Sequence, residues 1–133
     1  YFHVNEVVGQ DFSAKALEIA NTRYKFKNIK TVNISILDLE LPFQYFDLSI
    51  SNRVLQHVPK SKIEKYIKKL TQLSKYIYIN EMCKSDNIKD TYYMFQHNYE
   101  KLFEKNDFFL IKKGMIGRQT WHLFSCENIK GLS

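Results

Sequence analysis

The chain has 133 residues, of which 44% are hydrophobic and 26% are charged, as expected for one domain with its own core. Its net charge of +6 is mostly lysine, with arginine only at 23, 53 and 118, so a solvated surface is favoured over specific nucleic-acid recognition, while nonspecific attraction stays open. No apolar run reaches the roughly 20 residues of a membrane span and no signal peptide opens the chain, so we expect a cytoplasmic protein without membrane contact.

The first predicted element is a strand that ends in a carboxylate, Asp11. It begins with two β-branched valines, Gly9 would let another backbone approach closely, and Ser13 can cap a helix predicted over residues 14–25. Ligands of parallel α/β sheets lie beyond the carboxyl ends of the strands, so Asp11 can accept hydrogen bonds from both hydroxyls of a ribose. The alternative is that Asp11 only helps to start the helix.

Two further strands are predicted to end in polar side chains. Residues 31–36 alternate small polar and β-branched side chains, which is the period of a half-buried strand, and Asp38 follows them. After a loop that contains a proline, residues 46–51 form the next predicted strand, and Asn52 and Arg53 leave its carboxyl end.

A turn or short helix at residues 54–59 precedes a longer helix. Ser61 and Glu64 have the spacing of a capping box at the start of that helix. Its buried face is predicted to consist of Ile63, Tyr66, Ile67, Leu70 and Leu73. The lysines at 60, 62, 65, 68 and 69 are expected to face water.

The next predicted strand, residues 76–81, ends in Glu81. This carboxylate either faces the same crevice as the other strand ends or caps the segment that follows it. That segment is rich in aromatic side chains, which either line an apolar substrate pocket or pack a helix onto the sheet. These residues are Tyr92, Tyr93, Met94, Phe95, His97 and Tyr99.

The chain closes with a helix at about residues 99–105 and two antiparallel strands. The strands are predicted at 108–111 and 121–126, joined across Gly114 and Gly117. Strands that alternate with helices before a closing hairpin indicate an α/β fold with a mostly parallel sheet, in a single domain over residues 1–133.

Metal and nucleophile chemistry are not indicated. Two cysteines, Cys83 and Cys126, lie far apart, and free thiols are favoured over a disulfide or a zinc site. No histidine has a cysteine or a second histidine at ligand spacing, and neither thiol has a plausible base nearby in the sequence. The histidines are His3, His57, His97 and His122.

Three segments, taken in order along the chain, resemble class I S-adenosylmethionine-dependent methyltransferases. They are Val8–Ser13, Leu37–Asp38 with Leu41–Phe43, and Phe46–Val58. Asn106–Leu110 with Trp121–Phe124 is similar to the closing hairpin of that family. The resemblance covers most of the chain, and its specificity lies in the order and spacing of several short pieces. It implies a Rossmann-like fold and S-adenosylmethionine as cofactor.

The resemblance also implies the residues that bind this cofactor. In the family, the acid after the second strand binds the ribose, which assigns Asp11 with Phe12. The acid after the third strand meets the adenine amine, which assigns Asp38 with Leu39. The turn after the fourth strand lies along the methionine part, which assigns Asn52, Arg53 and His57.

One departure from the family concerns its first strand and glycine-rich turn. The glycines at 9, 114, 117 and 131 form no glycine-rich loop. In the family that strand lies between the strands predicted at 7–11 and 46–51, so its absence leaves two inner edges unpaired. We therefore expect the chain to be an N-terminally incomplete fragment that does not bind the cofactor alone.

The resulting prediction is methyl transfer to an oxygen, nitrogen or carbon atom of a small-molecule acceptor. His57 is the one candidate for a base near neutral pH, and the alternative is that it caps the turn before Pro59. Two alternatives stay open: a fragment of a NAD-dependent oxidoreductase, which also uses an acid after the second strand, and a non-catalytic truncated domain that acts as a subunit or interaction surface.

Overall fold

The computed structural model describes residues 4–82 and 94–127, and the chain divides into two compact units, Tyr1–Glu40 and Leu41–Ser133. The elements of the first unit are β1 (Val7–Asp11), α1 (Ala14–Arg23), β2 (Ile29–Asn33) and the 3-10 helix η1 (Ile36–Asp38). Those of the second are β3 (Phe46–Asn52), the 3-10 helix η2 (Leu55–His57), α2 (Ile63–Leu73), β4 (Ser74–Met82), α3 (Tyr99–Glu104), β5 (Phe109–Ile116) and β6 (Gln119–Ser125). The α/β class with a closing antiparallel hairpin is confirmed.

In the first unit, β1 and β2 pair in parallel through a helical crossover. The register runs from Val7 opposite Ile29 to Asp11 opposite Asn33, so both strands end at the same edge. Ser13 caps α1 as predicted, because its Oγ accepts a hydrogen bond from the Ala16 backbone N–H at 3.2 Å.

Two details of this unit differ from the sequence prediction. The second strand lies at Ile29–Asn33 rather than 31–36, because the Ser35 hydroxyl accepts a hydrogen bond from the Leu37 N–H at 3.3 Å and starts η1. Gly9 was expected to allow a close backbone approach, yet a Cβ there would meet only Thr31 Cγ2 at 3.7 Å and the Lys30 carbonyl at 3.9 Å, which are ordinary contacts.

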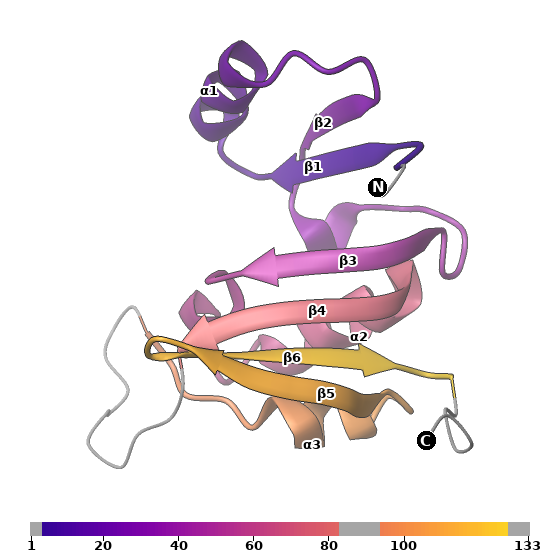
Figure 1. Ribbon diagram of the computed structural model, residues 1–133, viewed down its shortest axis with the longest axis vertical. Helices are drawn as coiled ribbons and strands as arrows, with labels where there is room; N and C mark the ends of the chain where they lie inside the picture. The colour runs from indigo at the N-terminus through magenta and orange to yellow at the C-terminus, as the bar shows by residue number, and fades with distance from the viewer. Residues whose placement is uncertain (1–3, 83–93, 128–133) are drawn as a thin grey trace. The chain divides into compact units, whose positions relative to one another are not determined.

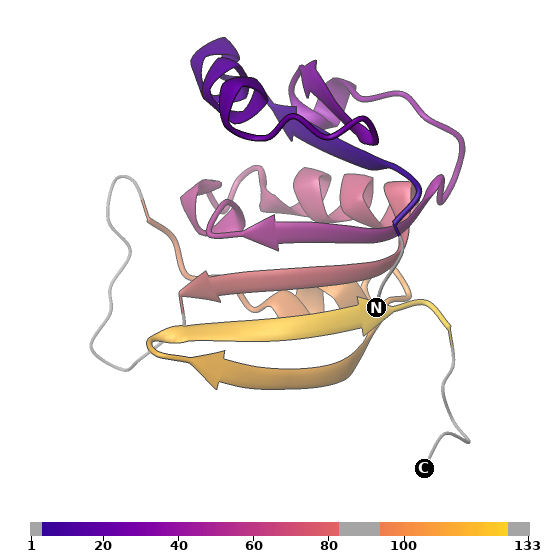
Figure 2. The ribbon, with the colours of Figure 1, turned by 45° about the horizontal axis from the view of Figure 1, so that its top comes forward.

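In the second unit the strand order is β3-β4-β6-β5, with β3 and β4 parallel and the remaining pairs antiparallel. Helices α2 and α3 lie on the same face of this sheet (Figures 1 and 2). Their apolar side chains and those of β4 and β6 form the core of the unit. Its fully buried members are Ile67, Ile77, Ile79, Phe103 and Phe124, and the Phe103 and Phe124 rings stack with centroids 4.1 Å apart.

The start of α2 was predicted incorrectly. Lys62 occupies the N-cap, and no side chain there bonds to the backbone, so Ser61 and Glu64 do not form a capping box. The predicted buried face is confirmed except at Tyr66, which is only half-buried. The lysines at 60, 62, 65 and 68 are exposed as predicted, and Lys69 is half-buried.

The hairpin strands are longer than predicted because Gly114 lies inside β5. A Cβ at this position would be 2.7 Å from ring atoms of Trp121, so glycine makes room for that ring, which stacks on Tyr78. The two-residue loop between the strands begins at Gly117, whose φ of +61° suits the first position of a type II′ turn.

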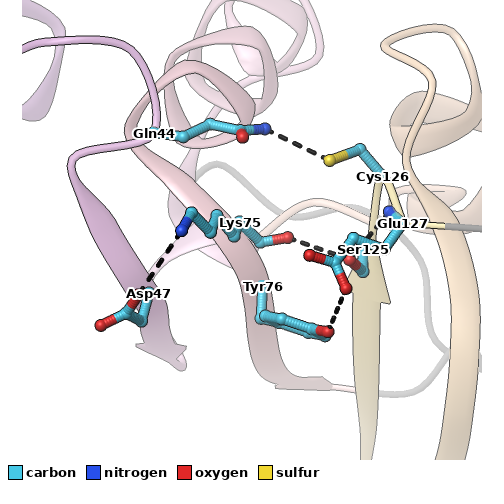
Figure 3. A network of polar contacts seen from close by, with 7 residues as sticks. All are labelled: Gln44, Asp47, Lys75, Tyr76, Ser125, Cys126 and Glu127. Atoms are coloured by element: carbon cyan, nitrogen blue, oxygen red, sulfur yellow. Dashed lines mark hydrogen bonds and ion pairs between the residues drawn. The ribbon is translucent and has the colours of Figure 1, made fainter.

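At the amino ends of β3 and β4, a polar network joins both strands to the end of β6 (Figure 3). The Tyr76 hydroxyl donates to the Glu127 carboxylate at 2.7 Å, and the Ser125 hydroxyl donates to the Lys75 carbonyl at 3.1 Å. Lys75 also lies 3.9 Å from the Asp47 carboxylate. Since parallel α/β sheets bind ligands at the opposite ends of their strands, we interpret this network as structural.

Each sheet has a strand with one unpaired edge. Within residues 4–82 and 94–127, β1 pairs with β2 alone and β3 pairs with β4 alone. No helix in those residues is long and apolar enough to cross a membrane.

Candidate functional site

Asp11 ends β1 and also takes part in starting α1. Its Oδ1 accepts a hydrogen bond from the Ser13 backbone N–H at 2.9 Å, so the helix-starting role considered from the sequence is present. A carboxylate has about four acceptor sites, and this contact uses one of them. Asp11 can therefore hold the start of the helix and accept hydrogen bonds from a ligand.

Phe12 follows Asp11 and is 82% exposed. An aromatic ring that is exposed at the carboxyl end of a strand offers an apolar surface to a flat ligand.

Asp38 lies at the end of η1, five residues beyond the last residue of β2 rather than directly after a strand. It is exposed, and its carboxylate has no hydrogen bond or ion pair within the described part of the chain. Leu39 caps η1 and is half-buried. The carboxylate of Asp38 is thus open to accept hydrogen bonds from an external donor.

In the second unit, polar groups gather where β3 and β4 end side by side. Asn52 lies opposite Asn80 in the parallel register, and the Asn80 amide donates to the Asn52 side-chain oxygen at 3.1 Å. The same amide donates to the Gln119 side-chain oxygen at 2.6 Å. The Asn80 side-chain oxygen is buried and has no partner among the described residues.

The chain bends sharply at Arg53 before it enters η2. Arg53 has a φ of +58°, in the left-handed region, and its N–H donates to the Asn80 carbonyl at 2.8 Å. His57 ends η2 and is exposed, with its Nε2 at 3.5 Å from the Gln56 side-chain nitrogen. The structure therefore brings Asn52, Arg53 and His57 into one short segment at the carboxyl end of β3.

Glu81, the next-to-last residue of β4, lies beneath this segment and is only 1% exposed. Its Oε1 accepts from the N–H groups of Val54 and Leu55 at 3.4 and 3.2 Å, and its Oε2 accepts from that of Gln56 at 3.2 Å. It caps a segment that precedes it in the chain. The residues directly after β4 lie outside the described ranges, so capping of the following segment stays a prediction. Burial raises the pKa of Glu81 to about 7, although these three hydrogen bonds and nearby His57 lower it.

The aromatic residues after the undescribed gap include one core residue. Tyr99 is 6% exposed in the core cluster, which supports the packing interpretation for this residue. The ring of His97 lies against that of Tyr99, and its Nε2 is 2.8 Å from the Val58 carbonyl oxygen. Tyr92 and Tyr93 lie outside the described residues.

The thiols and metal ligands add no further site in the described ranges. Cys126 is a free, half-buried thiol whose sulfur accepts a hydrogen bond from the Gln44 amide at 3.2 Å, and Cys83 falls outside those ranges. No cluster of three or more His, Cys, Asp or Glu side chains suited to a metal ion occurs in residues 4–82 and 94–127.

Sequence reasoning missed Gln56 and Asn80, which hold the segment after β3 in place. Gln56 lies in η2 and Asn80 near the end of β4, and their partners are set by the β3–β4 register rather than by local pattern. Glu81 carried a signal, because an acid that closes a buried strand needs donors close by.

Comparison with known proteins identifies a family. The model of the methyltransferase domain family matches residues 1–76, which is more than half of the chain. No curated protein matches the chain.

Several solved structures share the fold at low sequence identity. The 1,6-didemethyltoxoflavin-N1-methyltransferase of Burkholderia thailandensis, with bound 1,6-didemethyltoxoflavin and S-adenosylhomocysteine, has a TM-score of 0.74 at 13% identity over 92% of this chain and 62% of its own. The magnesium protoporphyrin IX methyltransferase of Synechocystis PCC 6803, with bound S-adenosylhomocysteine, has a TM-score of 0.72 at 17% identity, over 92% of this chain and 64% of its own. A putative S-adenosylmethionine-dependent methyltransferase of Listeria monocytogenes has a TM-score of 0.74 at 11% identity, over 94% of this chain and 82% of its own. The chain thus spans less than two thirds of the first two proteins.

Proposed function

The chain belongs to the methyltransferase domain family, and on this basis we propose that the protein is an S-adenosylmethionine-dependent methyltransferase with a small-molecule acceptor. The observation that carries the proposal is the family match over residues 1–76, which includes Asp11, Asp38 and the segment Asn52–His57. The small-molecule ligand and S-adenosylhomocysteine named for the Burkholderia structure support the acceptor class and the cofactor.

We assign the adenosyl part of the cofactor to Asp11, Phe12, Asp38 and Leu39. The carboxylate of Asp11 accepts hydrogen bonds from the ribose hydroxyls, and the exposed ring of Phe12 supplies apolar contact. Asp38 accepts from the exocyclic adenine amine, with Leu39 beside it. The fit rests on hydrogen-bond acceptor chemistry, since Asp38 is an exposed carboxylate with no partner among the described residues.

We assign the methionine part to the segment Asn52–His57. This part carries an ammonium and a carboxylate, which need polar partners of both kinds. The Asn52 side chain offers an acceptor and a donor, Arg53 offers a cation, and His57 offers a ring nitrogen.

When bound, S-adenosylmethionine supplies a methyl group that is already activated by the sulfonium. The residues of the chain therefore align the acceptor and exclude water rather than activate the donor. Methylation of an O–H or N–H acceptor would release a proton from that acceptor. His57 is the candidate to receive that proton.

The proposal is tested by equilibrium binding of S-adenosylhomocysteine and of NAD⁺ to the full-length gene product that contains these 133 residues. Calorimetric titration is expected to give saturable binding of S-adenosylhomocysteine and no binding of NAD⁺. Tight binding of NAD⁺ alone would replace the methyltransferase assignment with the oxidoreductase alternative. Absence of binding by either compound would favour the non-catalytic alternative.

A further inference from the structure

The segment Asn52–His57 does not hold its conformation by local structure alone. Its 3-10 helix η2 is three residues long, and its N-cap, Val54, makes no side-chain capping bond. The preceding residue, Arg53, adopts a left-handed backbone that costs a non-glycine residue free energy. Contacts from outside the segment must therefore stabilise it.

Glu81 supplies those contacts at three consecutive residues. The N–H groups of Val54, Leu55 and Gln56 have no acceptor within so short a helix, and all three point to one carboxylate at 3.2 to 3.4 Å. Hydrogen bonds to a charged acceptor are roughly twice as strong as neutral ones. A single side chain of β4 thus fixes the path of the backbone above it.

Gln56 adds two further hydrogen bonds that hold the same segment. Its side chain is 2% exposed, and its Oε1 accepts from the Met82 N–H at 2.9 Å, next to Glu81 in β4. Its carbonyl accepts from the Phe95 N–H at 2.7 Å. The segment is therefore tied to the end of β4 at Asn80, Glu81 and Met82, and to the chain at Phe95.

The carboxylate is costly for the fold. Glu81 is buried at the edge of an apolar core, and a buried carboxylate loses more hydration than a neutral side chain of the same size. A glutamine would fill the same volume without that charge, but its NH₂ group would face backbone donors. Packing alone does not require a carboxylate at this position. The carboxylate is suited to accept hydrogen bonds from three N–H groups that converge on one point.

We propose that Glu81 is the positioning residue of the Asn52–His57 segment, and that its carboxylate holds this segment in the conformation that binds the methionine part of the cofactor. The second half of this inference rests on the proposed function. Glu81 itself does not contact the cofactor, because its oxygens are used by backbone N–H groups and its side chain is buried.

The charge state of Glu81 links this role to pH. His57 on η2 and Tyr99 on α3 are the titratable groups that act on it, and His57 favours the carboxylate form. Burial raises the pKa of Tyr99, so it stays neutral in the working range. Opposite Glu81, Thr120 of β6 presents a buried hydroxyl without a partner in the described residues. Protonation of Glu81 removes the charge that the three N–H groups share.

The test compares the full-length wild type with Glu81→Gln, with Glu64→Gln as a matched control. Glu64 is an exposed glutamate of α2 that pairs with Lys105 at the surface. Amide hydrogen exchange at Leu55 and Gln56 should accelerate at least tenfold in Glu81→Gln, with Ile67 of α2 unchanged. The affinity for S-adenosylhomocysteine should fall at least tenfold in this variant and stay unchanged in the control.

The outcomes distinguish the positioning role of Glu81 from its effect on cofactor binding. Unchanged exchange at Leu55 and Gln56 would overturn the positioning role. Faster exchange with unchanged affinity would also overturn the inference, because the segment would then be held for another purpose. If the wild type does not bind S-adenosylhomocysteine, the proposed function fails, and the exchange data alone decide whether Glu81 fixes the segment. If Glu81→Gln does not fold, Glu81→Asp keeps the charge one methylene further away and should give the same changes at smaller size.

Discussion

Glu81 should make the free energy of unfolding depend on pH in a way that its glutamine variant does not. Its pKa is about 7 in the folded protein and 4.5 as the reference for an unfolded chain. The folded protein therefore binds the proton more tightly than the unfolded chain. The contribution of Glu81 to stability is fully present below pH 4.5 and is lost as the pH rises through 7.

The size of this effect follows from the two pKa values. Each pH unit between them is worth about 1.4 kcal/mol, so the full difference is about 3 kcal/mol. Between pH 5 and pH 8 the expected change is about 2.5 kcal/mol, because part of the window lies below pH 5. The side chain is 1% exposed, so solvent screening does not reduce this value greatly.

Urea denaturation of the wild type and of Glu81→Gln at several pH values isolates this contribution. The wild type should lose stability relative to the variant by about 2.5 kcal/mol as the pH is raised from 5 to 8. Titrating groups that do not interact with Glu81 act equally on both proteins and cancel in the difference. Parallel pH profiles would refute the reasoning, since they would mean that the carboxyl group has the same proton affinity in both states.

Three further predictions concern packing and the cofactor. Gly114→Ala should lower the free energy of unfolding by about 1–3 kcal/mol, because a Cβ there would lie 2.7 Å from the Trp121 ring. The control variant Gly9→Ala should lower it by less than about 0.5 kcal/mol, and equal urea midpoints of the two variants would contradict this. Phe124→Ala should cost about 3–5 kcal/mol by the same assay, since its ring is fully buried, and a loss below about 1 kcal/mol would show that the core repacks. Asp38→Asn should weaken binding of S-adenosylhomocysteine by roughly tenfold, measured by calorimetry, and unchanged affinity would remove Asp38 from the site.

The order and type of the elements could be predicted because they depend on local pattern. The apolar stripe of α2 reflects one helix face on a core, and it is observed. The closing hairpin is also observed, with Gly117 in its turn. The parallel pairing of β1 with β2 followed from the helix between them.

The predicted boundaries of helices and strands are wrong where two local sequence rules compete. Ser35 fits an alternating strand equally well as a cap, and its hydroxyl bonds to the backbone two residues on, which ends the strand earlier. Ser61 and Glu64 have the capping-box spacing, but the helix starts two residues after Ser61. The local pattern predicts Gly114 as a turn residue, but the need for glycine there comes from Trp121 on the neighbouring strand.

The candidate site was predictable only in part. Asp11, Asp38 and Asn52 could be named because they end or follow predicted strands. In the structure Asp11 and Asn52 end β1 and β3, whereas Asp38 lies at the end of η1, five residues beyond β2. The support beneath Asn52–His57 could not be predicted. It depends on the register that sets Asn52 opposite Asn80 and thus brings Glu81 under η2, and residues about 25 apart in the chain share no local pattern.

Binding of the cofactor by the three polar segments is tested most directly by an NMR titration of the full-length ¹⁵N-labelled gene product with S-adenosylhomocysteine. The backbone amide signals of Asp11, Asp38 and Asn52–His57 are expected to shift together and saturate at one ligand per chain. Those of Tyr76 and Glu127, in the network at the amino ends of β3 and β4 (Figure 3), should stay in place. Saturable binding that leaves all three segments unshifted would contradict the account.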